Sequence, residues 1–148
     1  MKANAAIKAV VKELLETQKF GVLATRTGES PHLNLVALAA APDMSRIFFA
    51  TARATSKYAN LRADGRAAVL VDNRSNRDAD LEKAAALNVI GEAREVGDDE
   101  RESLLGLFLG KHPSLTDFAR SPETAFFEIK VGKFILVREF GRVDAFEP

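Results

Sequence analysis

The sequence predicts a mainly β protein folded as a small antiparallel barrel, on three observations. Several short apolar segments follow one another, tight turns join most of them, and few helical patterns interrupt the series. A parallel sheet is disfavoured because the first three segments are linked by turns too short for the crossovers that parallel strands need. An α+β sandwich is the alternative. The length of 148 residues fits one domain, which we expect to cover residues 1–148.

The first segment has the periodicity of an amphipathic helix. Its apolar residues recur at the spacing of one helix face and are Ile7, Val10, Val11, Leu14 and Leu15. Strands are expected over residues 20–25 and from 32 to about 40, joined by a turn in which Gly28 can take a positive φ. The remaining expected strands cover residues 47–51, 67–71, 87–95, 125–131 and 134–140.

Two further helices interrupt the strands. The first follows the third strand directly, and Thr55 is placed to be its N-cap. The second begins at Asp98 or Asp99 and ends at Gly110, and Pro113 forbids its continuation. Asp99 and Glu102 have the spacing of a capping box at its start.

The composition excludes several classes of function. With no cysteine, the chain has no disulfide scaffold, no thiolate zinc site and no cysteine nucleophile. The 21 basic residues are balanced by 21 acidic ones, which argues against a dedicated nucleic-acid or membrane-surface protein. We find no apolar run of the ~20 residues that a membrane span needs and no uncharged core of a secretory signal, so we expect a cytoplasmic protein.

Motifs of common enzyme classes are absent from the sequence. His32 and His112, the two histidines, lack the ligand spacing of a metal site. No nucleophile elbow, dinucleotide-binding glycine motif or Walker loop is present. No side chain stands out as a general acid or base, so we assign no catalytic residue.

Positive charge is concentrated in one part of the sequence. Between residues 46 and 77 there are seven basic and two acidic residues. Free backbone N–H groups, the helix dipole and hydroxyl donors can together bind an anion at the start of the helix in this window, and Lys57 adds a full charge. A basic first turn opposes the dipole unless an anion compensates, which favours a ligand phosphate.

The alternative is that Thr55 is only a cap and the basic residues are a solvated face. Tyr58 is the one aromatic residue of this helix, so a nucleic-acid surface is not favoured.

The order and spacing of the segments resemble the FMN-binding split barrel of the pyridoxamine 5'-phosphate oxidase-like family, over roughly residues 8–140. The matching segments are Phe20-Gly-Val-Leu-Ala-Thr25, Gly28-Glu-Ser-Pro-His-Leu-Asn-Leu-Val36, Ile47-Phe-Phe-Ala-Thr51, Thr55-Ser-Lys57, Asn60-Leu61 and Arg66-Ala-Ala-Val-Leu70. The resemblance implies a split β-barrel of antiparallel Greek-key type. It also implies a homodimer with two FMN sites at the subunit interface.

The resemblance further implies where the flavin would lie. Backbone groups near Asn34, Leu35 and Val36 would line the edge of the isoalloxazine ring. Ala50 and Thr51, at the end of the next strand, would lie near the ribityl chain and the phosphate.

The phosphate would be held by Thr55, Ser56 and Lys57 at the start of the following helix. The family often has two adjacent basic residues there, and Ser56 replaces one of them. We infer that Arg53 compensates for this replacement. The biosynthetic oxidases of the family carry an Arg-x-His pattern near the carboxyl terminus, but no histidine follows His112 here, so their pyridoxal-type substrate is not expected.

The sequence therefore predicts an FMN-dependent oxidoreductase with an unassigned substrate. Two alternatives from other classes remain. The chain could be a non-catalytic flavin-binding or sensor module, or its barrel could bind another anionic cofactor, namely haem or the deazaflavin F420.

Overall fold

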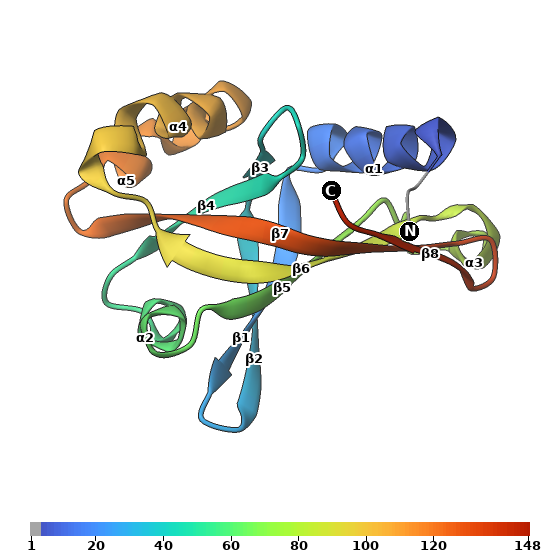
Figure 1. The fold of residues 1–148 in the computed structure, drawn as a ribbon, viewed down its shortest axis with the longest axis horizontal. Helices are drawn as coiled ribbons and strands as arrows, with labels where there is room; N and C mark the ends of the chain where they lie inside the picture. The colour runs from blue at the N-terminus through green and yellow to red at the C-terminus, as the bar shows by residue number, and fades with distance from the viewer. Residues whose placement is uncertain (1–3) are drawn as a thin grey trace.

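The computed structural model describes residues 4–148, whose strands form one antiparallel sheet that curls into a split barrel (Figure 1). The strand order is β2-β1-β5-β6-β7-β4-β3, with β8 paired to β7. The elements are α1 (Ala5–Thr17), β1 (Phe20–Thr27), β2 (Ser30–Ala37), β3 (Ala39–Ala40), β4 (Arg46–Ala52), α2 (Ser56–Ala63), β5 (Arg66–Asp72), α3 (Asp80–Lys83), β6 (Ala86–Glu95), α4 (Asp98–Lys111), the 3₁₀ helix η1 (Pro113–Leu115), α5 (Thr116–Arg120), β7 (Thr124–Arg138) and β8 (Arg142–Phe146).

The connections cross between distant strands. Strands β5, β6 and β7 are neighbours in sequence order, whereas β4 lies beside β7 and β1 beside β5. This is a Greek-key arrangement. The barrel closes where β2 contacts β4. The predicted fold class is therefore confirmed.

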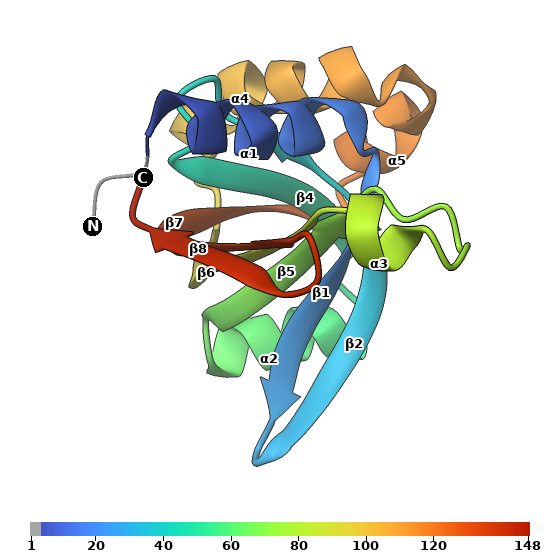
Figure 2. The same cartoon turned by 90° about the vertical axis from the view of Figure 1, so that its right-hand side faces the viewer.

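Two apolar cores lie on opposite faces of β4 and β7, because successive side chains of a strand point to opposite faces. Phe49 and Phe127 stack inside the barrel at 5.4 Å between ring centroids. Phe48 and Phe126 stack outside it at 5.8 Å, beneath α4. Helices α1 and α2 lie at opposite ends of the barrel (Figures 1 and 2) and contribute buried residues to the inner core.

Residues 125–131 and 134–140 were expected to be two strands, but they belong to the single strand β7. Ile90 of β6 faces Lys133, and the adjacent Gly91 faces Val131, which leaves Gly132 without a partner. A β-bulge of this kind absorbs one residue without ending the strand. The expected break at Gly132 is therefore wrong. Strand β8 and helix α5 had no counterpart among the expected elements.

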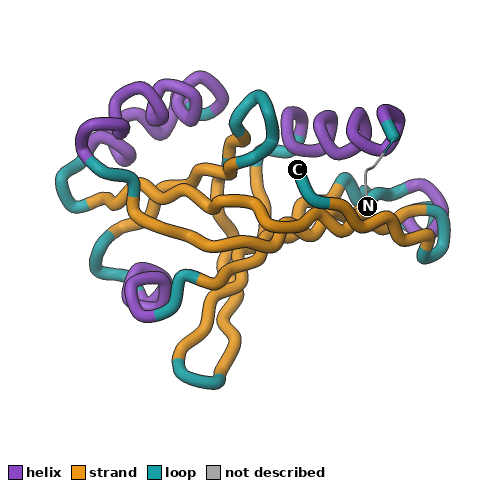
Figure 3. Tube along the Cα trace, in the orientation of Figure 1, coloured by secondary structure: helices purple, strands orange, loops and turns teal. Residues whose placement is uncertain are grey.

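The strand expected from residue 32 to 40 divides at Leu38, which is fully buried. Its first part, β2, pairs with β1, and its second part, β3, pairs with β4 (Figure 3). The chain thus crosses from one edge of the split to the other. The apolar run across residues 35–41 gives no sign of this change of partner.

Two expectations for α4 are corrected. The Asp99 carboxylate accepts a bond only from the N–H that follows it, and Glu102 pairs with Arg120, so no capping box forms. The helix passes through Gly110 and ends one residue later. Pro113, rather than the glycine, stops it, because proline has no N–H to continue the ladder.

The turn between β7 and β8 carries backbone strain. Glu139 and Phe140 are the central residues of the turn closed by the bond from Gly141 N to Arg138 O. Their φ values of 47° and 59° are the left-handed conformation that Asn-Gly adopts easily. Phe140 is 70% exposed and packs little. We expect Phe140→Gly to raise the free energy of unfolding by about 0.5–1 kcal/mol in urea titrations. Phe140→Ala removes the ring but keeps the unfavourable φ, so an equal gain in that variant would contradict this explanation.

Candidate functional site

The junction of β4 and α2 is held by two threonine hydroxyls. The Thr55 hydroxyl accepts a bond from Tyr58 N at 3.2 Å, which confirms Thr55 as the N-cap. It also donates to Ala52 O at 2.8 Å and lies 3.1 Å from the Thr51 hydroxyl. Because the Thr55 proton points to Ala52, Thr51 is the donor of this last bond. The first turn of α2 is thus fixed in place.

The start of α2 also presents free donors. The first intrahelical bond runs from Ala59 N to Thr55 O, so the N–H groups of Ser56 and Lys57 have no acceptor within the helix. The Lys57 side chain is half-buried, and burial lowers the pKa of its ammonium. Within residues 4–148 no carboxylate forms an ion pair with it. A first helical turn with free N–H groups and a half-buried, unpaired lysine suits an anion.

The positive charge seen in the sequence is mostly neutralised in three dimensions. Glu128 pairs with Arg46, and Glu95 lies within ion-pair distance of both Arg53 and Arg62. Within the window itself, the aspartates pair with neighbouring arginines, in the pairs Arg66–Asp64 and Arg74–Asp72. The positive charge concentrated between residues 46 and 77 is therefore largely paired, and less of it is free than the sequence count indicates. Lys57 is the cation that the described structure leaves unpaired at the junction.

Arg53, the inferred second phosphate ligand, is engaged elsewhere. Its Nη1 donates to both carboxylate oxygens of Glu95, at 2.9 and 3.1 Å, and to the Tyr58 hydroxyl at 3.3 Å. Its Nε donates to Pro122 O at 3.3 Å. Sequence reasoning missed Glu95, because only the pairing of β6 with β7 brings it beside α2. It stands opposite Phe127 in that pairing, and the Tyr58 ring packs edge-on against Phe127.

The predicted ring-binding residues lie on an edge strand. Asn34 and Leu35 are exposed, whereas Val36 is buried. Over its length β2 pairs with β1 alone, so its other edge has unpaired backbone groups. Ala37, at the end of β2, and Ala50 of β4 pack against the same core beneath α4. The structure thus brings the end of β2 close to the strand that leads to Thr51 and α2.

Helix α2 is also tied to the β1–β2 hairpin, which projects from the barrel beside it (Figure 1). Buried Asn60 donates to the Thr25 hydroxyl at 3.1 Å and accepts from the Thr27 hydroxyl at 2.5 Å. These two bonds fix the orientation of α2 relative to the hairpin. The hairpin, β4 and α2 therefore form one connected frame around the candidate site.

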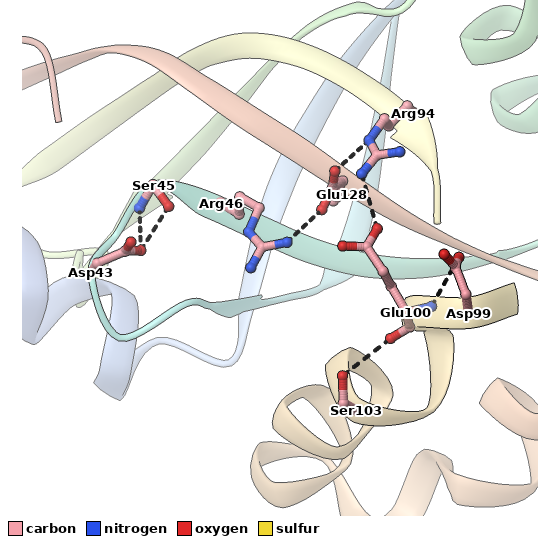
Figure 4. A network of polar contacts seen from close by, with 8 residues as sticks. All are labelled: Asp43, Ser45, Arg46, Arg94, Asp99, Glu100, Ser103 and Glu128. Carbon is pink, nitrogen blue, oxygen red and sulfur yellow. Dashed lines mark hydrogen bonds and ion pairs between the residues drawn. The ribbon is translucent and has the colours of Figure 1, made fainter. Parts of the chain in front are cut away.

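A groove of about 850 Å³ lies away from this frame, on the outer face of β4, β7 and β6. There the buried carboxylate of Glu128 is held between Arg46 and Arg94 (Figure 4). Arg94 also donates to Glu100 at 3.1 Å and so links the sheet to the first turn of α4. Because these charges satisfy one another, we assign the network to anchoring α4, and the candidate site remains the junction of β4 and α2.

The two histidines show no ligand geometry. His112 is buried, and its Nε2 lies 2.8 Å from Leu38 O, while His32 is exposed on β2. Residues 4–148 contain no group of three acidic or histidine side chains placed to hold a metal ion. In the same part of the chain, every helix is too short or too polar to cross a membrane.

The fold and the junction define a split-barrel protein with a corner suited to an anion. The family model described as pyridoxamine 5'-phosphate oxidase matches residues 7–138, and the chain belongs to this family. Proteins of this fold family bind flavins. A comparison with curated protein sequences finds no match.

Solved structures share the fold at low sequence identity. A haem-binding protein from Mycobacterium smegmatis has a TM-score of 0.83 and 20% identity, over 99% of this chain and 59% of that one. General stress protein 26 from Bacillus anthracis has a TM-score of 0.71 and 18% identity, over 95% and 98% of the two chains. An FAD-binding protein from Mesorhizobium loti has a TM-score of 0.67 and 18% identity, over 90% and 94%.

Proposed function

We propose that the chain is an FMN-binding flavoprotein that acts as an FMN-dependent oxidoreductase. The observation that carries the proposal is a first helical turn with two free N–H groups and a half-buried lysine, Lys57, for which the described residues provide no anionic partner. The phosphate of FMN supplies the missing negative charge. Membership of a flavin-binding family supports this choice over other anions.

In this proposal the phosphate is bound at the first turn of α2. The backbone N–H groups of Ser56 and Lys57, the Ser56 hydroxyl and the Lys57 ammonium are its donors. Thr51 and Thr55 orient the turn through their paired hydroxyls. Arg53 lies at the edge of this group, held by Glu95.

The isoalloxazine ring lies along β2 in the proposal. The unpaired backbone edge near Asn34, Leu35 and Val36 offers alternating donors and acceptors to the polar edge of the ring. Ala50 is small and half-buried, and it leaves room for the ribityl chain between β2 and the phosphate. Bound flavin would supply the hydride or electron transfer, and the protein would supply binding, orientation and electrostatic tuning.

We propose further that two copies of the chain assemble through an apolar sheet face. Cross-strand pairing places Leu33, Ala24, Ala68 and Ile90 in one row on the outer side of β2, β1, β5 and β6. The next row contains Leu35, Val22 and Leu70. Leu33 and Leu35 are 69% and 70% exposed, and most of this face is open in Figure 2, with α3 at one corner. Such a face on a soluble fold is typical of a protein interface.

The test is an absorption spectrum of the purified protein, followed by titration with FMN and with riboflavin. The expected result is one FMN per chain, with tighter binding of FMN than of riboflavin because only FMN has the phosphate. Colourless protein that also binds no added FMN would overturn the proposal. Difference spectra with haem and with the deazaflavin test the alternative cofactors. Turnover of reduced flavin with a candidate acceptor separates an oxidoreductase from a flavin-binding module.

A further inference from the structure

Glu95 is the last residue of β6, and its carboxylate is turned toward α2, where it is the centre of a cluster. It accepts bonds from Arg53 Nη1 at 2.9 and 3.1 Å and from the Tyr58 hydroxyl at 3.2 Å. Arg62 lies 4.0 Å away. The side chain of Glu95 is 23% exposed, so these partners replace most of its water.

Arg53 links this cluster to the proposed phosphate site. It stands two residues before the Thr55 cap, and its guanidinium lies 5.7 Å from the centroid of the Tyr58 ring. Its Nη1 donates hydrogen bonds to Glu95 and Tyr58, and its Nε donates one to Pro122 O. No bond within residues 4–148 uses its Nη2. At 39% exposure the side chain keeps room to turn.

A carboxylate and a phosphate both attract a guanidinium, and the bonds from Nη1 to Glu95 and from Nε to Pro122 O hold Arg53 in its present orientation. While Glu95 holds Arg53, the junction offers an incoming phosphate one full positive charge, that of Lys57. Glu95 also places a negative charge near the same phosphate. Both effects weaken the binding of a phosphorylated ligand and leave a ligand without phosphate unaffected.

We propose that Glu95 sets the affinity and selectivity for the cofactor phosphate by competing with it for Arg53. The inference rests on the proposed function, because it requires a phosphate at the first turn of α2. It makes Glu95 a positioning residue that acts through Arg53. The consequence is a moderated affinity, which allows the cofactor to exchange.

The test compares the dissociation constants of FMN and riboflavin for the wild type and Glu95→Gln. Glutamine keeps the size and hydrogen-bonding capacity of the side chain but removes its charge. We expect FMN to bind about tenfold more tightly to E95Q, the scale of one charged hydrogen bond, and riboflavin to bind as before. Glu95→Asp, which withdraws the carboxylate by one methylene, is a milder second variant with the same expected direction. Thermal unfolding of each variant reports whether it folds.

Two controls isolate the role of Arg53. Glu92→Gln removes the same charge as Glu95→Gln, but Glu92 lies on the outer face of β6. The FMN affinity of this variant should match that of the wild type. In an Arg53→Gln background, E95Q should lose most of its gain, because the released guanidinium is gone. Equal shifts for FMN and riboflavin, or an undiminished gain without Arg53, would overturn the inference.

The FMN and riboflavin titrations distinguish a failure of this inference from a failure of the proposed function. A wild type that binds neither FMN nor riboflavin rejects the flavin site itself. A wild type that prefers FMN over riboflavin, together with an E95Q variant of unchanged preference, rejects only the competition between Glu95 and the phosphate.

Discussion

Lys57→Ala is expected to weaken FMN binding about 5- to 150-fold, which corresponds to the ~1–3 kcal/mol of a charged hydrogen bond. The reason is that Lys57 is the cation left unpaired at the start of α2, while Arg53 is held by Glu95. Riboflavin affinity should change little, because riboflavin has no phosphate for the ammonium to meet. Fluorescence titration of both ligands measures the effect.

The control for this variant is Lys8→Ala, which removes an exposed lysine of α1 at the other end of the barrel. Its FMN affinity should equal that of the wild type. Lys57→Arg keeps the charge and should retain most of the affinity. If K57A binds FMN as tightly as the wild type, or loses riboflavin to the same extent, the phosphate does not lie at Lys57.

The same ammonium gives FMN binding a pH dependence. Burial lowers the Lys57 pKa below 10.5 in the free protein, and a bound phosphate favours the charged form and raises it again. Above the pKa of the free protein, binding therefore takes up a proton, and FMN affinity should fall as the pH rises through the alkaline range. The decline in affinity should be absent from K57A and should occur at higher pH in Lys57→Arg. A parallel decline in K57A would assign it to another group.

Local features of the structure follow from local sequence. The Thr55 cap needs only a hydroxyl before a helix, and Gly28 has the positive φ of 58° that its hairpin turn requires. The cap and the turn each depend on residues within four positions along the chain. Strands β1 and β5 were placed correctly, because buried and less buried side chains alternate along each of these segments.

Features that depend on distant partners could not be predicted in the same way. The carboxylate that neutralises Arg53 lies 42 residues along the chain, and Glu128 lies 82 residues from Arg46. Sequence spacing alone could not show which arginines of the positive window would be paired. The predicted site residues therefore lie on the expected elements, but fewer of the positive charges near them are unpaired than the sequence indicates. The unpaired Lys57 emerges only when the strand pairing is known.

Leu33→Glu is expected to weaken self-association by more than about 100-fold and to abolish FMN binding with it. In the proposed dimer each copy buries one Leu33, so the variant loses the burial of two leucines, at ~1.5–3 kcal/mol each, and places two uncompensated charges in an apolar interface. Leu33 lies on the outer face of β2 and is not assigned to the flavin, so a loss of FMN would report the loss of the second copy. Light scattering measures the mass, and FMN titration follows on the same sample.

The matched control is Leu81→Glu. Leu81 is also 69% exposed, but it lies on α3, outside the apolar rows, so the same substitution there should leave both the mass and the FMN affinity unchanged. If L33E keeps the wild-type mass, this face is not the interface. If L33E is monomeric and still binds FMN with wild-type affinity, each chain holds a complete flavin site by itself, and the placement of the cofactor between two copies is wrong.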